Sequence, residues 1–315
     1  LRAFAKNGGK APAGKITAFP APDAYQAEIQ QPHGERFMAS AKYAGENRVF
    51  GGRLSYLIQD EKEKLDSFTV KIYSASGEQI RTLKTLPSKG VNRIIWNLDR
   101  EMTGGWGGGQ GGGGRSRGFF EPSGGDALPG TYKVVMEYGG ESSETSITVN
   151  ADPRIQPTLS NLEAKDNFLK KVEALSSEVT ATTKKLDEAQ KVIDKVNSLI
   201  KDVKTDDAKA LETAAKDIKK KLDAAREAFT GPKVEGQGIV RNLFPTTMSR
   251  LFDPRSYANS SYTAPGATEE RLLTQAKEAA AEAIAKVEAF INGDWKAFED
   301  KVKATPIDLF QNIKK

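Results

Sequence analysis

The hydrophobic pattern of this chain is clearest between Phe168 and Val203, where its positions recur at alternating steps of four and three. The stripe consists of Phe168, Val172, Leu175, Val179, Thr182, Leu186, Ala189, Ile193, Val196, Ile200 and Val203. This spacing predicts one long helix with a single buried stripe. Because such a stripe is not stable alone in water, the helix needs partner helices.

Two further stripes with the same spacing follow. They consist of Leu211, Ala215, Ile218, Leu222, Ala225 and Phe229, and of Leu273, Ala276, Ala280, Ala283, Val287 and Ile291. Lys204-Thr205-Asp206-Asp207 supplies a turn and the N-cap of the first of these helices, Gly231-Pro232 ends it, and an acidic turn begins the second. We therefore predict an antiparallel helical bundle over residues 151–315, with long helices at about 159–203, 206–230 and 268–292. A brief apolar segment around Leu251, which could be a short helix, and a last short helix after Gly293 complete it.

Between residues 51 and 150 the pattern changes to a period of two. Six short runs are rich in Val, Ile, Thr and aromatic residues: Arg53–Ile58, Phe68–Tyr73, Gln79–Leu83, Asn92–Leu98, Thr131–Tyr138 and Glu144–Val149. Six such runs, each bounded by turn residues, predict an Ig-like antiparallel β-sandwich. Hairpin turns are expected at Ser76-Gly77 and Gly139-Gly140, and Trp96 is expected to anchor the core.

Residues 1–50 combine many Gly and Pro residues with scattered aromatic residues. This composition predicts an irregular aromatic strap or linker, and of the two we favour a strap that docks onto a preceding domain. The chain begins with Leu1 rather than Met, so we expect a processed chain or a fragment of a longer one.

The loop at residues 104–118, inside the predicted sandwich, has an unusual composition. Nine of the eleven residues in 104–114 are glycine. A phosphate-binding loop is not indicated, because the Gly-Lys-Ser/Thr ending and the strand-to-helix context are missing. The loop is therefore either a simple insertion or a contact loop. Its candidate ligand- or partner-contact residues are Trp106, Arg115, Arg117, Phe119 and Phe120.

Composition narrows the chemistry further. The 47 Lys and Arg residues are interspersed with 42 Asp and Glu residues, so no concentrated basic patch predicts nucleic-acid binding. No run of about 18 apolar residues predicts a membrane span. The chain has no Cys and one His, His33, in a Pro-Gly segment. We therefore predict no catalytic residues, no metal site and no cofactor, although 42 acids leave carboxylate pairs possible in principle.

The β-rich part resembles the Ig-like module of the flagellar hook-cap type. The similar segments are Phe68-Thr-Val-Lys-Ile-Tyr-Ser-Ala-Ser-Gly-Glu, Ile80-Arg-Thr-Leu, Gly90-Val-Asn-Arg-Ile-Ile-Trp-Asn-Leu and Leu128-Pro-Gly-Thr-Tyr-Lys-Val. With Asp152-Pro153-Arg154 and a helical hairpin after them, their order resembles the C-terminal region of secreted bacterial proteins with BNR/sialidase-like or sortilin-type β-propellers. In that family the propeller carries whatever activity exists. The present chain has no Asp-box motif, and no family catalytic residue maps onto it.

The resemblance implies a non-catalytic accessory or scaffolding region of an extracytoplasmic protein, in the periplasm, on the outer-membrane surface or secreted. Its partner would be an N-terminal β-propeller of the same parent chain or a cell-surface protein complex. The alternative is a glycan- or peptide-binding module of a glycosidase- or peptidase-like protein whose catalytic part lies outside this chain. Exposed aromatic rings would favour that alternative, and burial of the three tryptophans would count against it.

Overall fold

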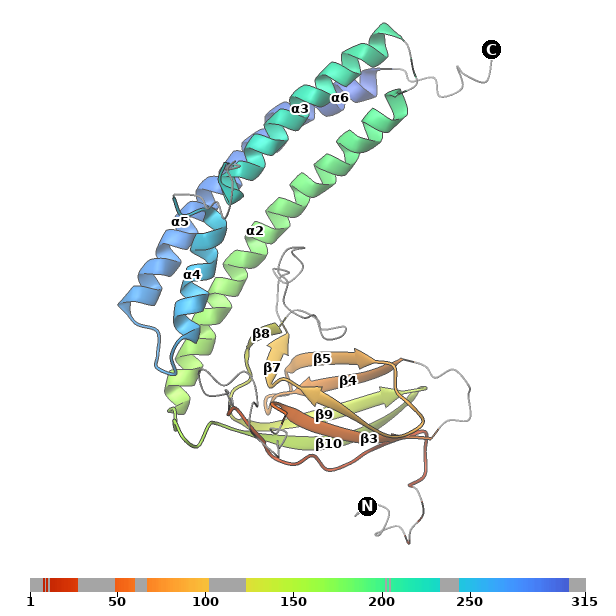
Figure 1. Cartoon of the computed structure of the whole chain (residues 1–315), viewed down its shortest axis with the longest axis vertical. Helices are drawn as coiled ribbons and strands as arrows, with labels where there is room; N and C mark the ends of the chain where they lie inside the picture. The colour runs from red at the N-terminus through yellow and green to blue at the C-terminus, as the bar shows by residue number, and fades with distance from the viewer. Residues whose placement is uncertain are drawn as a thin grey trace, which may run out of the picture. The chain divides into compact units, whose positions relative to one another are not determined.

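The computed structural model describes residues 8, 10, 12–27, 49–59, 67–101, 123–201, 203, 205–232 and 244–305. Within these ranges the chain is a mixed β + α protein, with all strands preceding all helices (Figure 1). It divides into two compact units, and the division falls inside α2, between Asn167 and Phe168. Residues 262–264 belong to the first unit and the other helices to the second.

The strands of the first unit form two larger sheets and one small one. The three-stranded antiparallel sheet has the order β1-β3-β6 (Ile16–Ala18, Gly52–Ile58, Gly90–Trp96). The five-stranded sheet has the order β2-β10-β9-β4-β5 (Ala24–Tyr25, Glu141–Asn150, Gly130–Tyr138, Phe68–Tyr73, Gln79–Thr85), and β4, β9 and β10 lie side by side in Figure 1. β7 (Asp99–Glu101) pairs with β8 (Ser123–Asp126).

Alternate residues of both larger sheets contribute to one hydrophobic core. The fully buried members include Leu54, Phe68, Val70, Ile72, Trp96, Val134 and Met136. This alternation is the period-two pattern of the sequence, with one face of each strand buried and the other solvated. Both predicted hairpins are confirmed, since β4 pairs with β5 and β9 pairs with β10. Gly139 and Gly140 have φ values of 56° and 83°, as a two-residue hairpin loop requires.

Part of the predicted irregular strap is regular. Ile16–Ala18 pairs antiparallel with β3, and Ala24–Tyr25 pairs parallel with β10. These five residues form short strands in a segment for which little regular structure was expected. Strands of two or three residues have too short a pattern to detect, and they form because neighbouring strands offer unpaired backbone groups.

The second unit contains α2 from Phe168 onward (α2, Leu159–Ile200), α3 (Asp206–Thr230), α4 (Thr247–Asn259), α5 (Ala267–Phe290) and α6 (Lys296–Ala304). Nine of the eleven predicted stripe positions of the first helix are buried, and Leu175 and Val203 are partly buried. The stripe of α3 is buried too, as are five of the six positions of the third predicted stripe; Ile291, which follows α5, is partly buried. Most of these residues join one core cluster.

The ends of the helices follow their sequence signals, with one exception. Thr205 caps α3 by accepting a hydrogen bond from the backbone N–H of Ala208, and Gly231 ends it. Gly293 was expected to separate the third long helix from a last short helix, but it does not interrupt the helix. Ile291–Trp295 forms a π-helical turn that connects α5 to α6 without a break, and Asp294 in this turn pairs with Lys221 of α3 at 2.5 Å.

Adjacent residues of α2 provide a test of the stripe. Ile193 is 0% exposed, whereas the neighbouring Val192 is 45% exposed. We predict that Ile193→Ala lowers the free energy of unfolding by about 2–5 kcal/mol through lost burial and a residual cavity. Urea unfolding followed by helical circular dichroism measures this change.

Val192→Ala is the matched control and should change the free energy of unfolding by less than about 0.5 kcal/mol. Equal effects of the two substitutions would show that the stripe does not face the core.

Candidate functional site

The outer face of the five-stranded sheet carries an open groove of about 650 Å³. Strand register places Tyr73 of β4 opposite Lys133 of β9, and Lys133 opposite Ser146 of β10. These three side chains therefore form one row across the groove floor. Its rim comes from Ser74, Ala75 and Gly77 in the β4–β5 hairpin turn.

Two acids on this face are held in ion pairs. Glu137 accepts a hydrogen bond from the Lys71 Nζ at 2.8 Å, and Glu144 lies 2.8 Å from the Lys133 Nζ. The hydrogen bond to Glu137 raises the pKa of Lys71 above its usual value. Both pairs are exposed to solvent, so each contributes little to stability.

The side chains that line the groove can make packing contacts and hydrogen bonds with a ligand. Its lining combines an aromatic ring at Tyr73, the ammonium of Lys133 and the hydroxyls of Ser74, Thr131 and Ser146. A ring and several hydroxyls on a rigid sheet suit a sugar face or the backbone of a peptide.

A second group of polar residues is buried in the first unit. The Arg81 Nε lies 3.6 Å from the Asp99 Oδ1, and both side chains are almost fully buried. Next to them, the Arg100 Nε donates to the Asp166 Oδ1 at 2.9 Å. The two Asp99 carboxylate oxygens accept no hydrogen bond in the described part of the chain, and the nearby Arg81 guanidinium offsets their charge. This group joins strands to the first turns of α2.

Two titratable side chains in the same unit, Lys165 and Tyr132, have shifted pKa values. Burial lowers the pKa of Lys165, partly offset by Asp126, and the ammonium lies 5.6 Å from the ring centre of Tyr262. Burial, with a smaller contribution from Asp166, raises the pKa of Tyr132 to about 12, and its hydroxyl donates to the Leu128 carbonyl. Both groups act as structural partners inside the unit.

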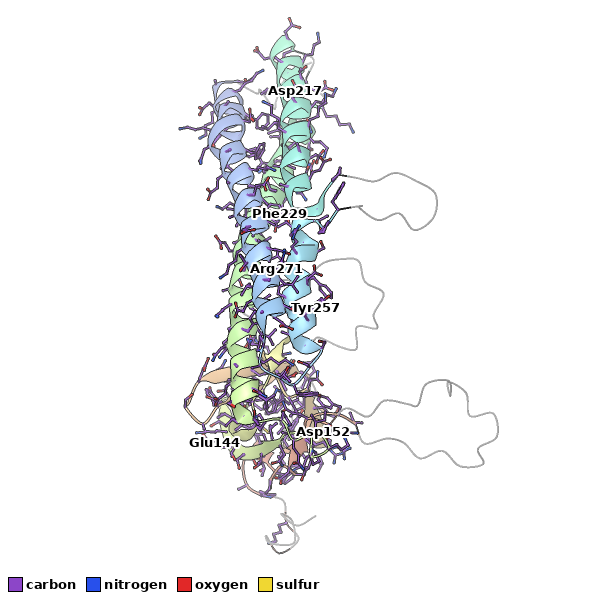
Figure 2. All side chains as sticks on the ribbon, turned by 90° about the vertical axis from the view of Figure 1, so that its left-hand side faces the viewer. Glu144, Asp152, Asp217, Phe229, Tyr257 and Arg271 are labelled. Atoms are coloured by element: carbon purple, nitrogen blue, oxygen red, sulfur yellow. The ribbon has the colours of Figure 1, made fainter. Side chains whose placement is uncertain are left out.

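The turn between β10 and α2 depends on a buried carboxylate. Asp152, labelled in Figure 2, accepts hydrogen bonds from the Arg154 backbone N–H at 2.9 Å and from the Arg154 guanidinium at 2.5–3.1 Å. These bonds lower the pKa of Asp152 below its usual value. The Asp152 carbonyl also accepts from the N–H groups of Ile155 and Gln156, and the turn holds Gln156 at a φ of 49°.

The candidate contact residues Trp106, Arg115, Arg117, Phe119 and Phe120, and also His33, lie outside the described residues. The other two tryptophans are placed. Trp96 is fully buried, donates from its Nε1 to the Asp99 carbonyl at 2.8 Å and packs edge-on against Tyr132, as predicted for a core anchor. Trp295 is half-buried against the helical core.

The groove was not predicted from sequence, because its floor comes from three strands whose register decides which side chains meet. The only sequence signals were the hairpin turns at Ser76-Gly77 and Gly139-Gly140, which fix the pairing of β4, β9 and β10 with their neighbours. In the described ranges, no three His, Cys, Asp or Glu side chains come together as metal ligands, and no helix is long and apolar enough to span a membrane.

Comparison with known proteins identifies no relative of this chain. No protein-family profile, curated protein or solved structure matches this chain.

The lowered pKa of Asp152 leads to a prediction about the stability of the fold at low pH. Because its folded-state pKa is lowered, its ionisation stabilises the fold above the unfolded value of 3.8, and this contribution is lost as the pH falls through the folded pKa. Asp152→Asn should therefore be less stable than the wild type at pH 7 and should lose less stability on acidification below pH 3.8. Melting temperatures between pH 7 and pH 2 measure both effects.

Glu282→Gln is the control, because the pKa of Glu282 is also lowered, by Lys286, but the pair is exposed on α5. Screening by solvent should make its effect much smaller. A pH profile of Asp152→Asn parallel to that of the wild type would refute the role of Asp152.

Proposed function

We propose that this chain is a non-catalytic contact module, in which an Ig-like antiparallel β-sandwich precedes an antiparallel helical bundle. Two sheets that share one core support the sandwich, and three long helices with buried stripes support the bundle. Both units are built around cores of their own, as expected for a part that holds or positions other components.

The groove on the five-stranded sheet carries this proposal. It presents a ring and hydroxyls on a rigid surface, and the Lys133 ammonium in it is paired with Glu144, as Lys71 is with Glu137. Such a surface provides contacts without an acid–base pair of its own. We infer that it receives a surface of another domain or protein.

The parent protein is inferred from the sequence resemblance. We propose that the module belongs to a secreted or cell-surface bacterial protein with a BNR/sialidase-like or sortilin-type β-propeller, outside the cytoplasm. The propeller or a cell-surface complex would be its partner.

The second candidate function is binding of a glycan or peptide in the same groove. Tyr73 beside several hydroxyls is the observation that favours it, since an aromatic ring can stack on a sugar or a peptide side chain while hydroxyls bond its polar groups. Against it stands the burial of Trp96 and the half-burial of Trp295, which leave neither as a fully exposed platform.

A photo-crosslinking amino acid at Tyr73 tests the contact function in the native host. We predict a crosslink to one defined peptide, from either the parent chain or one surface protein, identified by mass spectrometry. The same crosslinker at exposed Lys296 on α6 is the control and should not give that product. Absence of a defined product at Tyr73, or the same product from both positions, would contradict the proposal.

Binding to a glycan and peptide panel separates the two functions. If the groove binds a small ligand, Tyr73→Ala should weaken binding by about tenfold or more, because a stacked ring contributes about 1–3 kcal/mol. Lys84→Ala on β5, outside the groove, is the control. If no glycan or peptide of the panel binds, the second function is refuted. The crosslinking experiment then tests the first function.

A further inference from the structure

The strand β6 forms an open edge of the three-stranded sheet. It pairs with β3 over all seven residues, from Gly90 opposite Ile58 to Trp96 opposite Gly52, and with no strand on its other side in the described ranges. Alternate residues of such an edge strand direct backbone N–H and C=O groups away from the sheet, where another extended chain can bind them.

Side-chain burial differs along this edge: Trp96 of β6 is fully buried, whereas the middle of the strand is more exposed than β3. The core-facing residues of β3, Leu54, Tyr56 and Ile58, are at most 2% exposed. The core-facing residues Asn92 and Ile94 of β6 are only half-buried, although Ile94 packs against the same core. An added strand would cover Ile94 with its own inward side chains.

The outer face at this edge is apolar and basic. On β6 it presents Val91, which is 65% exposed, together with Arg93 and Ile95. Arg53 on β3 lies opposite Ile95, and Arg93 lies opposite Ser55. Arg93 donates a long hydrogen bond to the Ser55 hydroxyl, and neither arginine forms an ion pair with an acid in the described part of the chain. No outward residue of β1, β3 or β6 is acidic.

We propose that β6 binds an extended segment of a partner protein by strand addition, and that this segment has acidic side chains on its outward face and apolar side chains on its inward face. Opposite charges on directly opposed residues stabilise neighbouring strands, so an acid beside Arg93 is favoured. The inference rests on the proposed contact function but uses a surface separate from the groove.

Arg93 also argues against a second copy of this chain as the occupant. Arg93 is the central residue of β6, so the fullest antiparallel pairing of two β6 strands places Arg93 opposite Arg93. Like charges directly opposed across strands are destabilising. The arginine thus disfavours self-pairing while attracting an acidic strand.

The test uses the full chain and a synthetic peptide in which valine alternates with aspartate. When its valines face inward, all of its aspartates lie on the outward face. We expect the peptide to bind, and deuterium exchange of the β6 amides to slow while that of β5 is unchanged. Arg93→Glu should weaken binding by about tenfold, because repulsion replaces attraction, and should favour the matching valine–lysine peptide.

Lys84→Glu is the matched control, since it reverses an exposed cation on the edge strand β5 of the other sheet, and it should alter binding less than twofold. Circular dichroism and melting verify that both variants are folded. Absence of peptide binding, equal effects of the two substitutions, or protection of β5 instead of β6 would each overturn the proposal.

Tyr73→Ala distinguishes this site from the groove. The valine–aspartate peptide should bind this variant as it binds the wild type. Loss of peptide binding in Tyr73→Ala would assign the peptide to the groove and refute strand addition at β6.

Discussion

The buried stripe of α2 is the constraint on which the helical unit depends. Residues from Val179 to Ile200 contribute to the same cluster as the stripes of α3 and α5 and as Phe290 and Phe298. α2 supplies larger side chains such as Leu186 and Ile193, whereas α5 supplies alanines. The backbone of α5 lies close to those of both α3 and α4. Small residues permit close approach of helices, and the larger ones of α2 fill the remaining space. Figure 2 shows Phe229, a buried residue of the α3 stripe, and Tyr257 on the exposed side of α4.

Periodicity predicted the elements wherever one buried face extends over several residues. The stripes of α2, α3 and α5 and the alternation in β4 and β9 each repeat often enough to define a helix or a strand. The short strands β1, β2, β7 and β8 were missed, because their pairing comes from neighbours that are distant in sequence. The π-helical turn at Gly293 was missed for a related reason: packing of Phe290, Trp295 and Phe298 on the helical core and the Asp294–Lys221 pair offset the low helix propensity of glycine.

The functional surfaces were less predictable than the fold. The groove depends on Tyr73, Lys133 and Ser146 forming one row, and the basic edge depends on Arg93 lying outward on the last strand of its sheet. Both follow from strand register and strand order, which local sequence patterns do not encode. Composition indicated conspicuous residues in the glycine-rich loop, whereas the groove and the edge are built from ordinary strand residues.

We propose that this chain is a contact module of a larger extracytoplasmic protein. Intact-mass measurement with N-terminal sequencing of the protein from its native source tests it most directly. We expect a mass well above 34.2 kDa, with a β-propeller preceding these residues. A mature protein of 34.2 kDa that begins at Leu1 would contradict it.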